Sequence, residues 1–404
     1  MINIGLIGLG TVGSGVVEIL NKRKDELKSI LGSELFIKRI LVKNINKKRD
    51  ISLGKSLITL EFDEILKDSD ISIIIEATGD LEESYNYIKK SLKAGKNVVT
   101  ANKAVVSKYF EELTNMANKN NCAFLYEASV GGGIPILKPL KEVVATNEIT
   151  QIQGILNGTC NYILTRMFDE KLAYEEALKI AQELGYAELD PTADIEGYDT
   201  LRKLRILGTI ALKGKISEED ILVRGIKGII PFDIEQIKKL GCTVKLIAEV
   251  KSTGDKFTAM VQPTIIKKNS YFANVNMAFN SVAFIGNNVG ELKFYGSGAG
   301  KFPTANAVLS DVLDIVKSSY RKGNPLGKRK LKNINEKIKE PYYLRVSSEY
   351  KKKFTILYDM ADEILSTTDN IAIITKEVSI QNILSLISSL GIDDDKYFLG
   401  RIVK

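Results

Sequence analysis

The sequence contains no histidine, and this absence restricts the chemistry that the chain can carry out. Any proton transfer must be carried out by lysine, tyrosine, aspartate, glutamate, cysteine or water. Any metal ion would have to bind oxygen ligands, because no imidazole is available. The three cysteines, Cys122, Cys160 and Cys242, are odd in number and far apart in the chain. They therefore indicate neither a disulfide framework nor a zinc site.

Long hydrophobic runs and an extreme charge balance are missing as well. No apolar run approaches the roughly 18 residues of a membrane-spanning helix, and the apolar run Met1–Ile7 enters a glycine turn rather than a cleavage site. We therefore expect a cytoplasmic protein that does not engage a membrane. The net charge of +7 is spread through lysine-rich stretches, which we interpret as surface solvation or mild attraction for anionic cofactors rather than nucleic-acid binding.

The start of the chain carries a glycine pattern. The apolar run Met1–Ile7 breaks at Gly8, Gly10 and Gly13, and a helical pattern follows. A strand, a glycine turn and a helix in this order are the context of a dinucleotide-binding fingerprint, in which N–H groups at the helix start bind the diphosphate. A glycine-rich turn in some other α/β domain is the alternative. The cofactor-binding candidates in this stretch are Gly8, Gly10, Thr11, Val12 and Gly13.

The end of the second predicted strand, Leu35–Val42, bears on the choice of cofactor. An acidic residue at this place binds the ribose 2′-hydroxyl of NAD, whereas a cation suits the 2′-phosphate of NADP. The chain offers Lys43 and further cations, with no acidic residue until Asp50. We therefore expect NADP(H) to be favoured over NAD(H), with a solvated basic loop as the alternative.

Two further strands are expected to end at the same edge of a parallel sheet. Ile71–Ile75 is an apolar run interrupted only by Ser72, typical of a strand covered on both faces, and it leads to Thr78. The strand Asn97–Thr100 leads directly to Lys103. Because ligands bind at the carboxyl ends of such strands, Thr78 and Lys103 are candidates for contact with cofactor or substrate. An ordinary loop lysine is the alternative for Lys103, since the next helix is predicted to begin at Lys108.

Two glycine-rich segments lie further along the chain. Gly131–Gly133 follows a predicted strand at Ala123–Glu127, and glycine's freedom of backbone angle would let several carbonyl groups turn around a cation. A tight turn is the alternative. The glycines at residues 296–300 precede a predicted helix at Asn306–Ser318, where they form either a place of close backbone approach to a cofactor or a plain loop.

The most acidic stretch, residues 185–203, leads into an apolar helix at Leu204–Leu212. Asp199 and Lys203 are four residues apart and share a face if both are helical. One interpretation is a cleft in which acids hold a substrate ammonium while a lysine moves a proton. The alternatives are a solvated acidic loop and a surface ion pair that contributes a few tenths of a kcal/mol, on the order of 0.5.

The whole chain of 404 residues predicts two or three domains. We expect a dinucleotide-binding domain at 1–135, a catalytic and dimerisation domain at 136–320, a basic linker at 321–339 and a small module at 340–404, with the helix near 304–320 packing back on the first domain. Within the module the pattern predicts strands at Tyr342–Ser347, Ile371–Thr375 and Tyr397–Val403, and helices at Phe354–Leu365 and Ile380–Leu390.

Several of these stretches, taken in order over residues 1–320, resemble the homoserine dehydrogenase family. They are GLGTVGSG at Gly8–Gly15, TANKA at Thr100–Ala104, YEASVGGGIPI at Tyr126–Ile136, ILNGTCNYIL at Ile155–Leu164, GYAELDPTADIEGYDTLRKLRIL at Gly185–Leu207 and YGSGAGKFPTANAV at Tyr295–Val308. The resemblance implies an α/β fold with a Rossmann-type doubly wound sheet, an α+β catalytic domain and a homodimer or higher oligomer. It also implies NAD(P)-dependent interconversion of L-homoserine and L-aspartate 4-semialdehyde, on the pathway to threonine and methionine.

The resemblance assigns roles to individual residues. Lys203 matches the lysine beside the reacting oxygen, with Lys103 as its partner, and Glu188, Asp194 and Asp199 match the acids around the substrate. The residues implied for the nicotinamide side are Asn157, Gly158, Thr159, Gly298 and Gly300. Those implied for a monovalent cation, Na⁺ or K⁺, mostly through main-chain oxygens, are Glu127, Val130, Gly132 and Ile134.

The module at 340–404 resembles an ACT-type regulatory domain in its opening stretch, Glu340–Val346. It lacks a Pro-Gly turn in its first loop, and one strand is missing from the pattern between Leu365 and Ile371. We therefore expect dimerisation or a remnant role at least as much as threonine feedback. For the chain as a whole the alternatives are another amino-acid semialdehyde oxidoreductase and a nucleotide-sensing regulator, and the lysine–carboxylate pattern argues against the regulator.

Overall fold

The computed structural model describes residues 1–49, 54–320, 326–353, 355–367 and 370–403. The chain divides into two compact units. The first comprises Met1–Asn147, Thr209–Lys215 and Gly296–Lys328, and the second comprises Glu148–Gly208, Ile216–Tyr295 and Arg329–Lys404. Within the described residues, no helix combines the length and the hydrophobicity that crossing a membrane requires.

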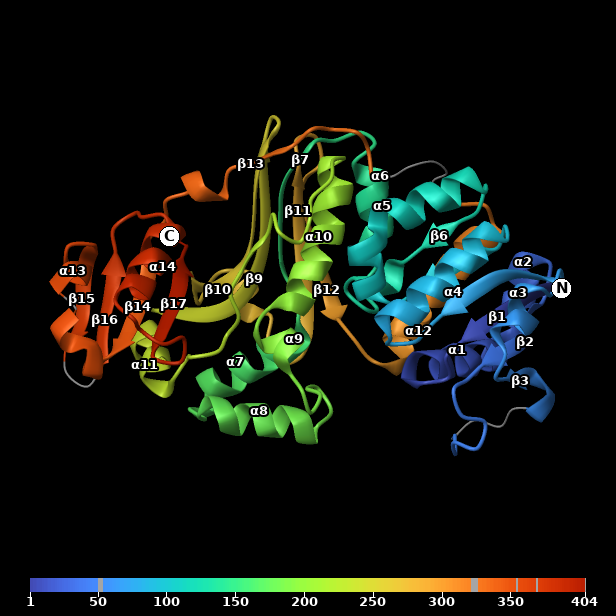
Figure 1. Ribbon diagram of the computed structural model, residues 1–404, viewed down its shortest axis with the longest axis horizontal. Coiled ribbons are helices and arrows are strands. Elements are labelled where there is room, and N and C mark those ends of the chain that lie inside the picture. The colour runs from blue at the N-terminus through green and yellow to red at the C-terminus, as the bar shows by residue number, and fades with distance from the viewer. Residues whose placement is uncertain (50–53, 321–325, 354, 368–369, 404) are drawn as a thin grey trace. The chain divides into compact units, whose positions relative to one another are not determined.

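The first unit is built on a six-stranded sheet in the order β3-β2-β1-β4-β5-β6, in which every pair of neighbours is parallel (Figure 1). This order is the doubly wound Rossmann arrangement, as the glycine pattern predicts. The strands are β1 (Ile2–Ile7), β2 (Leu35–Leu41), β3 (Ile58–Thr59), β4 (Ile71–Glu76), β5 (Asn97–Thr100) and β6 (Phe124–Leu125). The helices are α1 (Thr11–Lys22), α2 (Lys24–Leu31), α3 (Phe62–Leu66), α4 (Leu81–Lys93), α5 (Lys103–Lys119), α6 (Leu137–Val143) and α12 (Lys301–Val316).

Helix α12 returns from late in the chain to the first unit and packs against α1 (Figure 1). Its apolar side chains share one core with those of β1 and α1. Gly15 permits this close packing, because a Cβ there would lie 2.8 Å from the carbonyl oxygen of Lys301. An ion pair between Lys301 and Glu18 at 2.6 Å adds to the contact.

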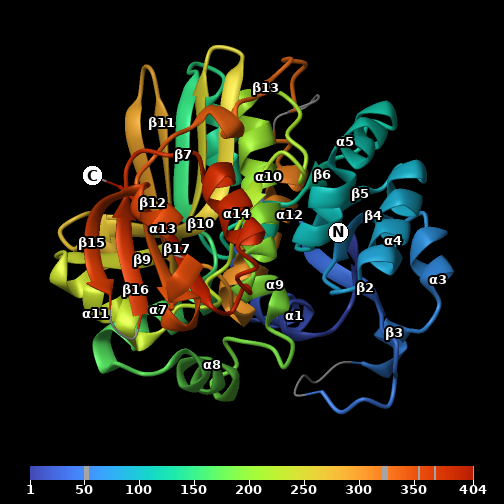
Figure 2. The same ribbon diagram turned by 60° about the vertical axis from the view of Figure 1, so that its left-hand side comes forward.

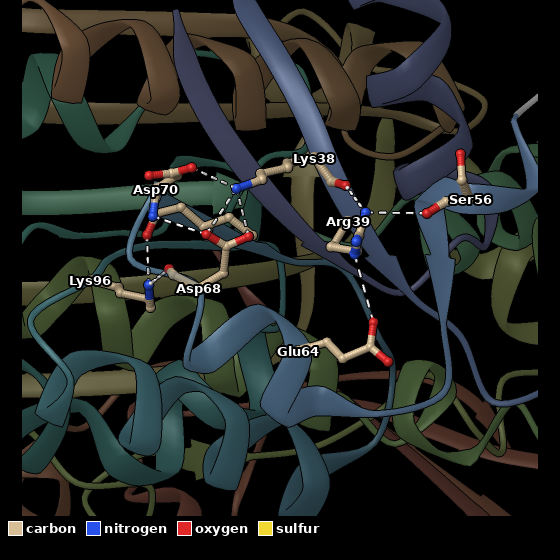
Figure 3. A network of polar contacts seen from close by, with 8 residues as sticks. Lys38, Arg39, Ser56, Glu64, Asp68, Asp70 and Lys96 are labelled. Atoms are coloured by element: carbon tan, nitrogen blue, oxygen red, sulfur yellow. Dashed lines mark hydrogen bonds and ion pairs between the residues drawn. The ribbon is translucent and has the colours of Figure 1, made fainter.

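A polar network joins β2 to the amino ends of β4 and β5 (Figure 3). Lys38 on β2 donates hydrogen bonds to Asp68 at 2.9 Å and Asp70 at 2.8 Å. Lys96 donates to the main-chain oxygens of Asp68 and Ile71, both at 2.7 Å. Asp70 and Lys96 directly precede β4 and β5, so the network stabilises the sheet at the amino ends of its strands. Ligands bind in this fold at the other end, at the carboxyl ends of the strands.

The second unit is built on a larger mixed sheet in the order β12-β11-β7-β9-β10-β17-β14-β16-β15, with β8 and β13 also paired to β10. Its strands are β7 (Ile149–Ile155), β8 (Leu222–Val223), β9 (Cys242–Thr253), β10 (Lys256–Lys267), β11 (Phe279–Gly286), β12 (Gly290–Ser297), β13 (Lys332–Asn333), β14 (Tyr342–Ser347), β15 (Ala361–Thr367), β16 (Asn370–Thr375) and β17 (Tyr397–Ile402). Its helices are α7 (Gly158–Glu170), α8 (Tyr174–Glu183), α9 (Thr192–Ile195), α10 (Tyr198–Leu212), α11 (Pro231–Lys239), α13 (Thr355–Tyr358) and α14 (Ile380–Ser389). Short 3₁₀ turns in the two units lie at Lys55–Leu57, Glu127–Ser129, Phe272–Asn274, Asn335–Lys337 and Ser348–Lys353.

The C-terminal region has the order β14-α13-β15-β16-α14-β17, a β-α-β-β-α-β pattern of the ferredoxin-like type. Its four strands lie side by side in the order β17-β14-β16-β15 (Figure 1), and Figure 2 shows β15, β16 and β17 from another direction. Strand β17 also pairs in parallel with β10, through Thr264 with Arg401 and Ile265 with Ile402. The region therefore continues the main sheet of the second unit. An ACT-type role for it stays a prediction.

Two expectations about this region were wrong. Residues 361–365 are not the second half of a helix but the start of β15, which pairs with β16, so the strand missing from the pattern is present. The pairing has register irregularities between Ala361 and Glu363 and between Ile364 and Ser366, which disturb the alternation by which a strand is recognised. Phe354, the predicted helix start, lies outside the described residues.

The stretch predicted as a linker at 321–339 is partly packed. Strand β13 pairs with β10, and the side chain of Asn335 is buried, with its oxygen accepting from the Ala259 N–H at 2.9 Å and its nitrogen donating to the Asp220 carbonyl at 2.9 Å. Residues 321–325 lie outside the described part of the chain. The domain boundaries themselves stay a prediction.

Candidate active site

The glycine turn after β1 has the geometry of a phosphate cradle. Gly8 has φ +94, a conformation that favours glycine, and a Cβ there would lie 2.8 Å from the carbonyl oxygen of Ala77. A Cβ on Gly13 would collide with the carbonyl oxygen of Gly8, whereas a Cβ on Gly10 would meet no atom within 4 Å. The backbone therefore faces open space at Gly10, which is the N-cap of α1. Thr11 and Val12 are the first residues of that helix, so this part of the chain fits a dinucleotide.

Glu76, the last residue of β4, organises the loop that carries Thr78. Its carboxylate is fully buried and accepts hydrogen bonds from the N–H and hydroxyl of Thr78 at 2.7 and 2.6 Å, from Ser84 at 2.9 Å and from Thr100 at 2.6 Å. Burial raises the pKa of this carboxyl group, and the hydrogen bonds act in the opposite direction. No role for Glu76 was predicted from the sequence. An acidic residue at the end of an otherwise apolar strand is the signal that would have found it.

Lys103 is the first residue of α5, so the expectation that this helix begins at Lys108 was wrong. The cause is Asn102, whose side-chain oxygen accepts from the N–H groups of Ala104 at 3.1 Å and Val105 at 3.2 Å and so caps the helix. Lys103 is thereby half-buried on a regular element directly after β5, rather than on a loose loop. A helix start holds the backbone of a side chain more firmly than a loop does.

Lys43 follows β2, and its exposed ammonium group forms an ion pair with Glu83 of α4 at 2.6 Å. This hydrogen bond raises the pKa of Lys43. A cation and a carboxylate therefore both lie near the end of β2, and the sequence analysis identified only the cation. Asp50 lies outside the described residues.

In the second unit, Lys203 and Asp199 form a buried ion pair on α10 with Nζ and Oδ2 2.8 Å apart. Lys203 is 8% exposed and Asp199 2% exposed, so the pair is not the solvated surface contact that the sequence left open. The Lys203 ammonium also donates to the carbonyl oxygen of Leu156 at 2.7 Å. Helix α10 begins at Tyr198, six residues before the predicted Leu204, and this early start is what brings Asp199 and Lys203 onto one helical face.

Asn157 joins this pair to a second carboxylate. Its Nδ2 donates to Asp199 at 2.8 Å and to Asp194 at 2.7 Å, while its oxygen caps α7 by accepting from the Cys160 N–H at 2.8 Å. The next residues of α7 are also fixed. The Thr159 hydroxyl donates to the Tyr186 carbonyl at 2.6 Å, and a Cβ on Gly158 would lie 2.7 Å from the Ala278 carbonyl oxygen.

Glu188 and Cys160 are two further residues that the sequence singles out in this part of the chain. Glu188 lies in the exposed segment after α8, where its main-chain oxygen accepts from Gln182 at 3.1 Å. Cys160 is buried, and burial raises the pKa of its thiol well above the usual value. A thiol of raised pKa is a poor nucleophile, which argues against a covalent mechanism through Cys160.

The residues implied for a cation site lie in the first unit, from the 3₁₀ turn Glu127–Ser129 to the segment before α6. The carboxylate of Glu127 is engaged at the start of α6, where it accepts from the N–H groups of Ile136 at 2.6 Å and of Leu137 and Lys138 at 2.8 Å. Among the described residues, no group of three or more acidic or cysteine side chains is arranged to hold a metal ion. A cation here would therefore depend on main-chain oxygens.

The main chain in this segment takes left-handed conformations at two successive glycines. Gly131 has φ +77 and Gly132 φ +56, and a Cβ on Gly132 would collide with the Gly298 carbonyl. The Gly133 N–H donates to the Ser297 carbonyl at 3.1 Å. The two glycine-rich segments of the first unit thus lie against each other, with Gly300, φ +122, as the N-cap of α12. Val130 and Ile134 are both buried here.

Asp311 on α12 predicts a pH dependence of stability. It accepts from the Glu127 N–H at 2.8 Å, and burial together with the nearby Glu127 carboxylate raises its pKa to about 8, against the pull of Lys141. Between about pH 4 and pH 8 the folded chain holds a proton that the unfolded chain has lost, so stability falls as the pH rises through this range. Asp311→Asn should flatten that fall, as measured by urea unfolding at several pH values.

The exposed Asp63→Asn on α3 is the matched control for this measurement, and it should leave the pH dependence in the upper part of the range as it is in the unchanged chain. A dependence between about pH 5 and pH 8 that is equally steep in the Asp311→Asn chain would contradict the assignment.

A Rossmann sheet with a glycine cradle, together with a buried lysine–carboxylate cluster, defines an NAD(P)-dependent oxidoreductase. Residues 8–127 match the family model described as homoserine dehydrogenase, NAD binding domain, and residues 135–313 match the model described as homoserine dehydrogenase. The chain therefore belongs to the homoserine dehydrogenase family, as the sequence motifs predict.

Individual relatives agree with this assignment. The homoserine dehydrogenase of Bacillus subtilis is 44% identical over 317 residues, covering 78% of this chain and 73% of that protein. The solved structure of a homoserine dehydrogenase from Thiobacillus denitrificans matches with a TM-score of 0.88 at 32% identity, covering 100% of this chain and 98% of that chain. A hyperthermophilic archaeal homoserine dehydrogenase, solved in complex with NADPH, matches with a TM-score of 0.66 at 25% identity, covering 80% of this chain and 99% of that chain.

Proposed function

We propose that this chain catalyses the reversible NAD(P)-dependent interconversion of L-homoserine and L-aspartate 4-semialdehyde, as a cytoplasmic homodimer or larger homo-oligomer. The observation that carries the proposal is the buried cluster in which Lys203 pairs with Asp199, and Asn157 links Asp199 to Asp194. A buried ammonium group beside a carboxylate is suited to stabilise a developing alkoxide and to exchange its proton.

Hydride transfer, proton transfer and substrate binding fall to different groups. A bound nicotinamide supplies or accepts the hydride. Lys203 donates a proton to the aldehyde oxygen in the direction of reduction and accepts it back in the direction of oxidation. Asp199 orients the ammonium group through the 2.8 Å contact. Asp194 and Glu188 bind the substrate's amino group, and Lys103 acts as the second cation at the substrate and nicotinamide.

The cofactor is held in the glycine cradle of Gly8, Gly10 and Gly13, with Thr78 and the segments around Gly158 and Gly298 on the nicotinamide side. NADP(H) is favoured because Lys43 presents an exposed ammonium group after β2. The NADPH named for the archaeal structure supports this choice. A monovalent cation, Na⁺ or K⁺, is held by the segment 127–134, chiefly by main-chain oxygens.

Replacing Lys43 with alanine tests the cofactor preference. The KM for NADPH should rise about three- to tenfold, because an exposed charge-assisted hydrogen bond to a phosphate contributes only modestly, while the KM for NADH should stay within about twofold. Steady-state kinetics with both cofactors measure this. The control is Lys67→Ala, which removes another exposed lysine that pairs with a carboxylate in the same unit. Equal effects on both cofactors would contradict the role of Lys43.

The proposed activity is tested by following reduced nicotinamide in the absorbance of a reaction that contains the purified chain, L-homoserine and either NADP⁺ or NAD⁺. Formation of reduced cofactor supports the proposal. Turnover with another amino-acid alcohol or semialdehyde, but not with homoserine, would favour a different oxidoreductase. Cofactor binding without turnover of any of these compounds would favour a nucleotide-sensing regulator.

A further inference from the structure

We infer that Glu76 is a positioning residue that holds Lys103 and Thr78 in the positions from which they contact the substrate and the cofactor. The inference rests on the proposed function, since it takes Lys103 and Thr78 to act at the substrate and cofactor. It concerns residues of the first unit only, and every contact that it uses lies at the carboxyl ends of β4 and β5.

The first observation is the environment of the carboxylate. Glu76 is 0% exposed, and its described hydrogen-bond donors are hydroxyl and N–H groups, not lysine or arginine. A buried carboxylate without a cation is expensive, and the strand that it ends is otherwise apolar on its buried positions. An apolar residue at this position would be buried at a lower cost in free energy. The carboxylate therefore serves to hold its hydrogen-bond donors in fixed positions.

The second observation is that the two oxygens of Glu76 serve different segments. Oε1 accepts from Thr78 and from Ser84, which belong to the β4–α4 loop and to α4. Oε2 accepts from the hydroxyl of Thr100, the last residue of β5, at 2.6 Å. One side chain therefore joins the loop that carries Thr78 to the end of β5, which leads to Lys103 at the start of α5.

The third observation is that the contacts close into a ring. The Thr100 hydroxyl accepts from the Asn102 N–H at 3.0 Å, and Asn102 Nδ2 donates to Ser84 at 3.2 Å, which in turn donates to Glu76. Asn102 is also the cap that starts α5, so the ring fixes the residue directly before Lys103. Each hydroxyl in the ring both donates and accepts a hydrogen bond. Loss of one member therefore leaves the hydroxyl groups next to it without a partner that fixes their orientation.

It follows that breaking the Oε2 arm should shift Lys103 slightly without unfolding the sheet. A displacement of a fraction of an ångström at a catalytic group reduces the rate of the chemical step more than it reduces binding. The arm can be broken at Thr100, which the proposed mechanism does not place in contact with the reacting atoms.

The experiment compares Thr100→Val, Thr100→Ser and the control Thr114→Val in steady-state kinetics and in direct NADPH binding. Thr100→Val should lower kcat about tenfold or more, with the KM for homoserine and the Kd for NADPH within about twofold of the unchanged chain. Thr100→Ser keeps the hydroxyl and should restore kcat. Thr114 on α5 is also buried, and its hydroxyl has no hydrogen-bond partner in the described structure, so Thr114→Val should leave kcat unchanged.

A second variant, Glu76→Gln, keeps one acceptor oxygen and loses the other. It should lower kcat as Thr100→Val does, and the double variant should be no slower than the slower single variant, because both changes break the same arm. A normal kcat in Thr100→Val, an equal loss in Thr100→Ser, or an equal loss in Thr114→Val would each overturn the inference. An unchanged chain that binds NADPH but does not turn homoserine over would overturn the proposed function, and the inference with it.

Discussion

Replacing Lys203 with alanine should lower kcat by about three orders of magnitude, while the Kd for NADPH stays nearly unchanged. The estimate combines loss of the proton donor, on the order of 10²- to 10⁴-fold, with loss of the positive charge next to the alkoxide. Cofactor affinity should be spared because the glycine cradle that binds the diphosphate is built from the first unit, and Lys203 belongs to the second. Single-turnover kinetics and NADPH fluorescence measure the two quantities.

The alanine variant also leaves Asp199 buried without its cation, so a folding defect has to be separated from a chemical one. Lys203→Gln keeps a hydrogen-bond donor of similar length and should fold with a similar Tm, yet remain as slow as Lys203→Ala because an amide does not supply a proton. Arg202→Ala removes the neighbouring half-buried cation on the same helix and should keep a normal kcat. A kcat like that of the unchanged chain in either Lys203 variant would refute the assignment.

The second large effect concerns stability and lies at Arg345. Its guanidinium forms a buried ion pair with Asp233, and the two side chains are 3% and 0% exposed. Asp233 also accepts from the Tyr343 hydroxyl at 2.8 Å and from the Ile230 N–H at 2.9 Å, at the start of α11. Arg345→Ala should therefore lower the free energy of unfolding by about 3–5 kcal/mol, because it leaves a carboxylate buried without its cation.

Urea unfolding of the full chain measures this effect. Lys108→Ala, which removes an exposed ion pair with Glu82, is the control and should leave the unfolding midpoint unchanged. Replacing Arg345 and Asp233 together with apolar residues should recover part of the loss, since the uncompensated charge is then absent. A loss for Arg345→Ala no larger than that for Lys108→Ala would show that α11 and β14 do not depend on this pair.

Much of the first unit could be predicted because most positions of its central strands are buried. Apolar runs such as Ile71–Ile75, interrupted only by Ser72 and bounded by turn residues, identify strands of a parallel sheet without any knowledge of their partners. The C-terminal region was harder to predict. Strand β15 exposes Ile364 and pairs irregularly with β16, so its sequence has neither a clean alternation nor a continuous apolar run. Only the pairing with β16 distinguishes it from a helix.

In the candidate site, too, some contacts could be predicted from the sequence and others could not. The spacing of Asp199 and Lys203 predicts their contact, because a helix brings residues four apart onto one face. That Asn157 bridges Asp199 to Asp194 depends on where the start of α7 lies relative to α10, and no local pattern in the sequence reports such a distance. For Glu127, the family resemblance implies a place in a cation site held mostly by main-chain oxygens, and this stays a prediction; the sequence did not indicate that three N–H groups engage its carboxylate. A side chain's competing partners become visible only after folding.

The pairing of β17 with β10 has a consequence for how this enzyme can be handled. Along one side β10 is covered by β9, but along the other it is completed in short pieces by β8, β13 and β17. Two of these pieces come from the last quarter of the sequence. A shortened chain that ended near residue 320 would leave part of β10 as a bare strand edge, open to pairing with other molecules. The C-terminal region thus pairs with an otherwise open strand of the mixed sheet in the second unit. Its removal should lower the solubility of the chain before any effect on regulation could be observed.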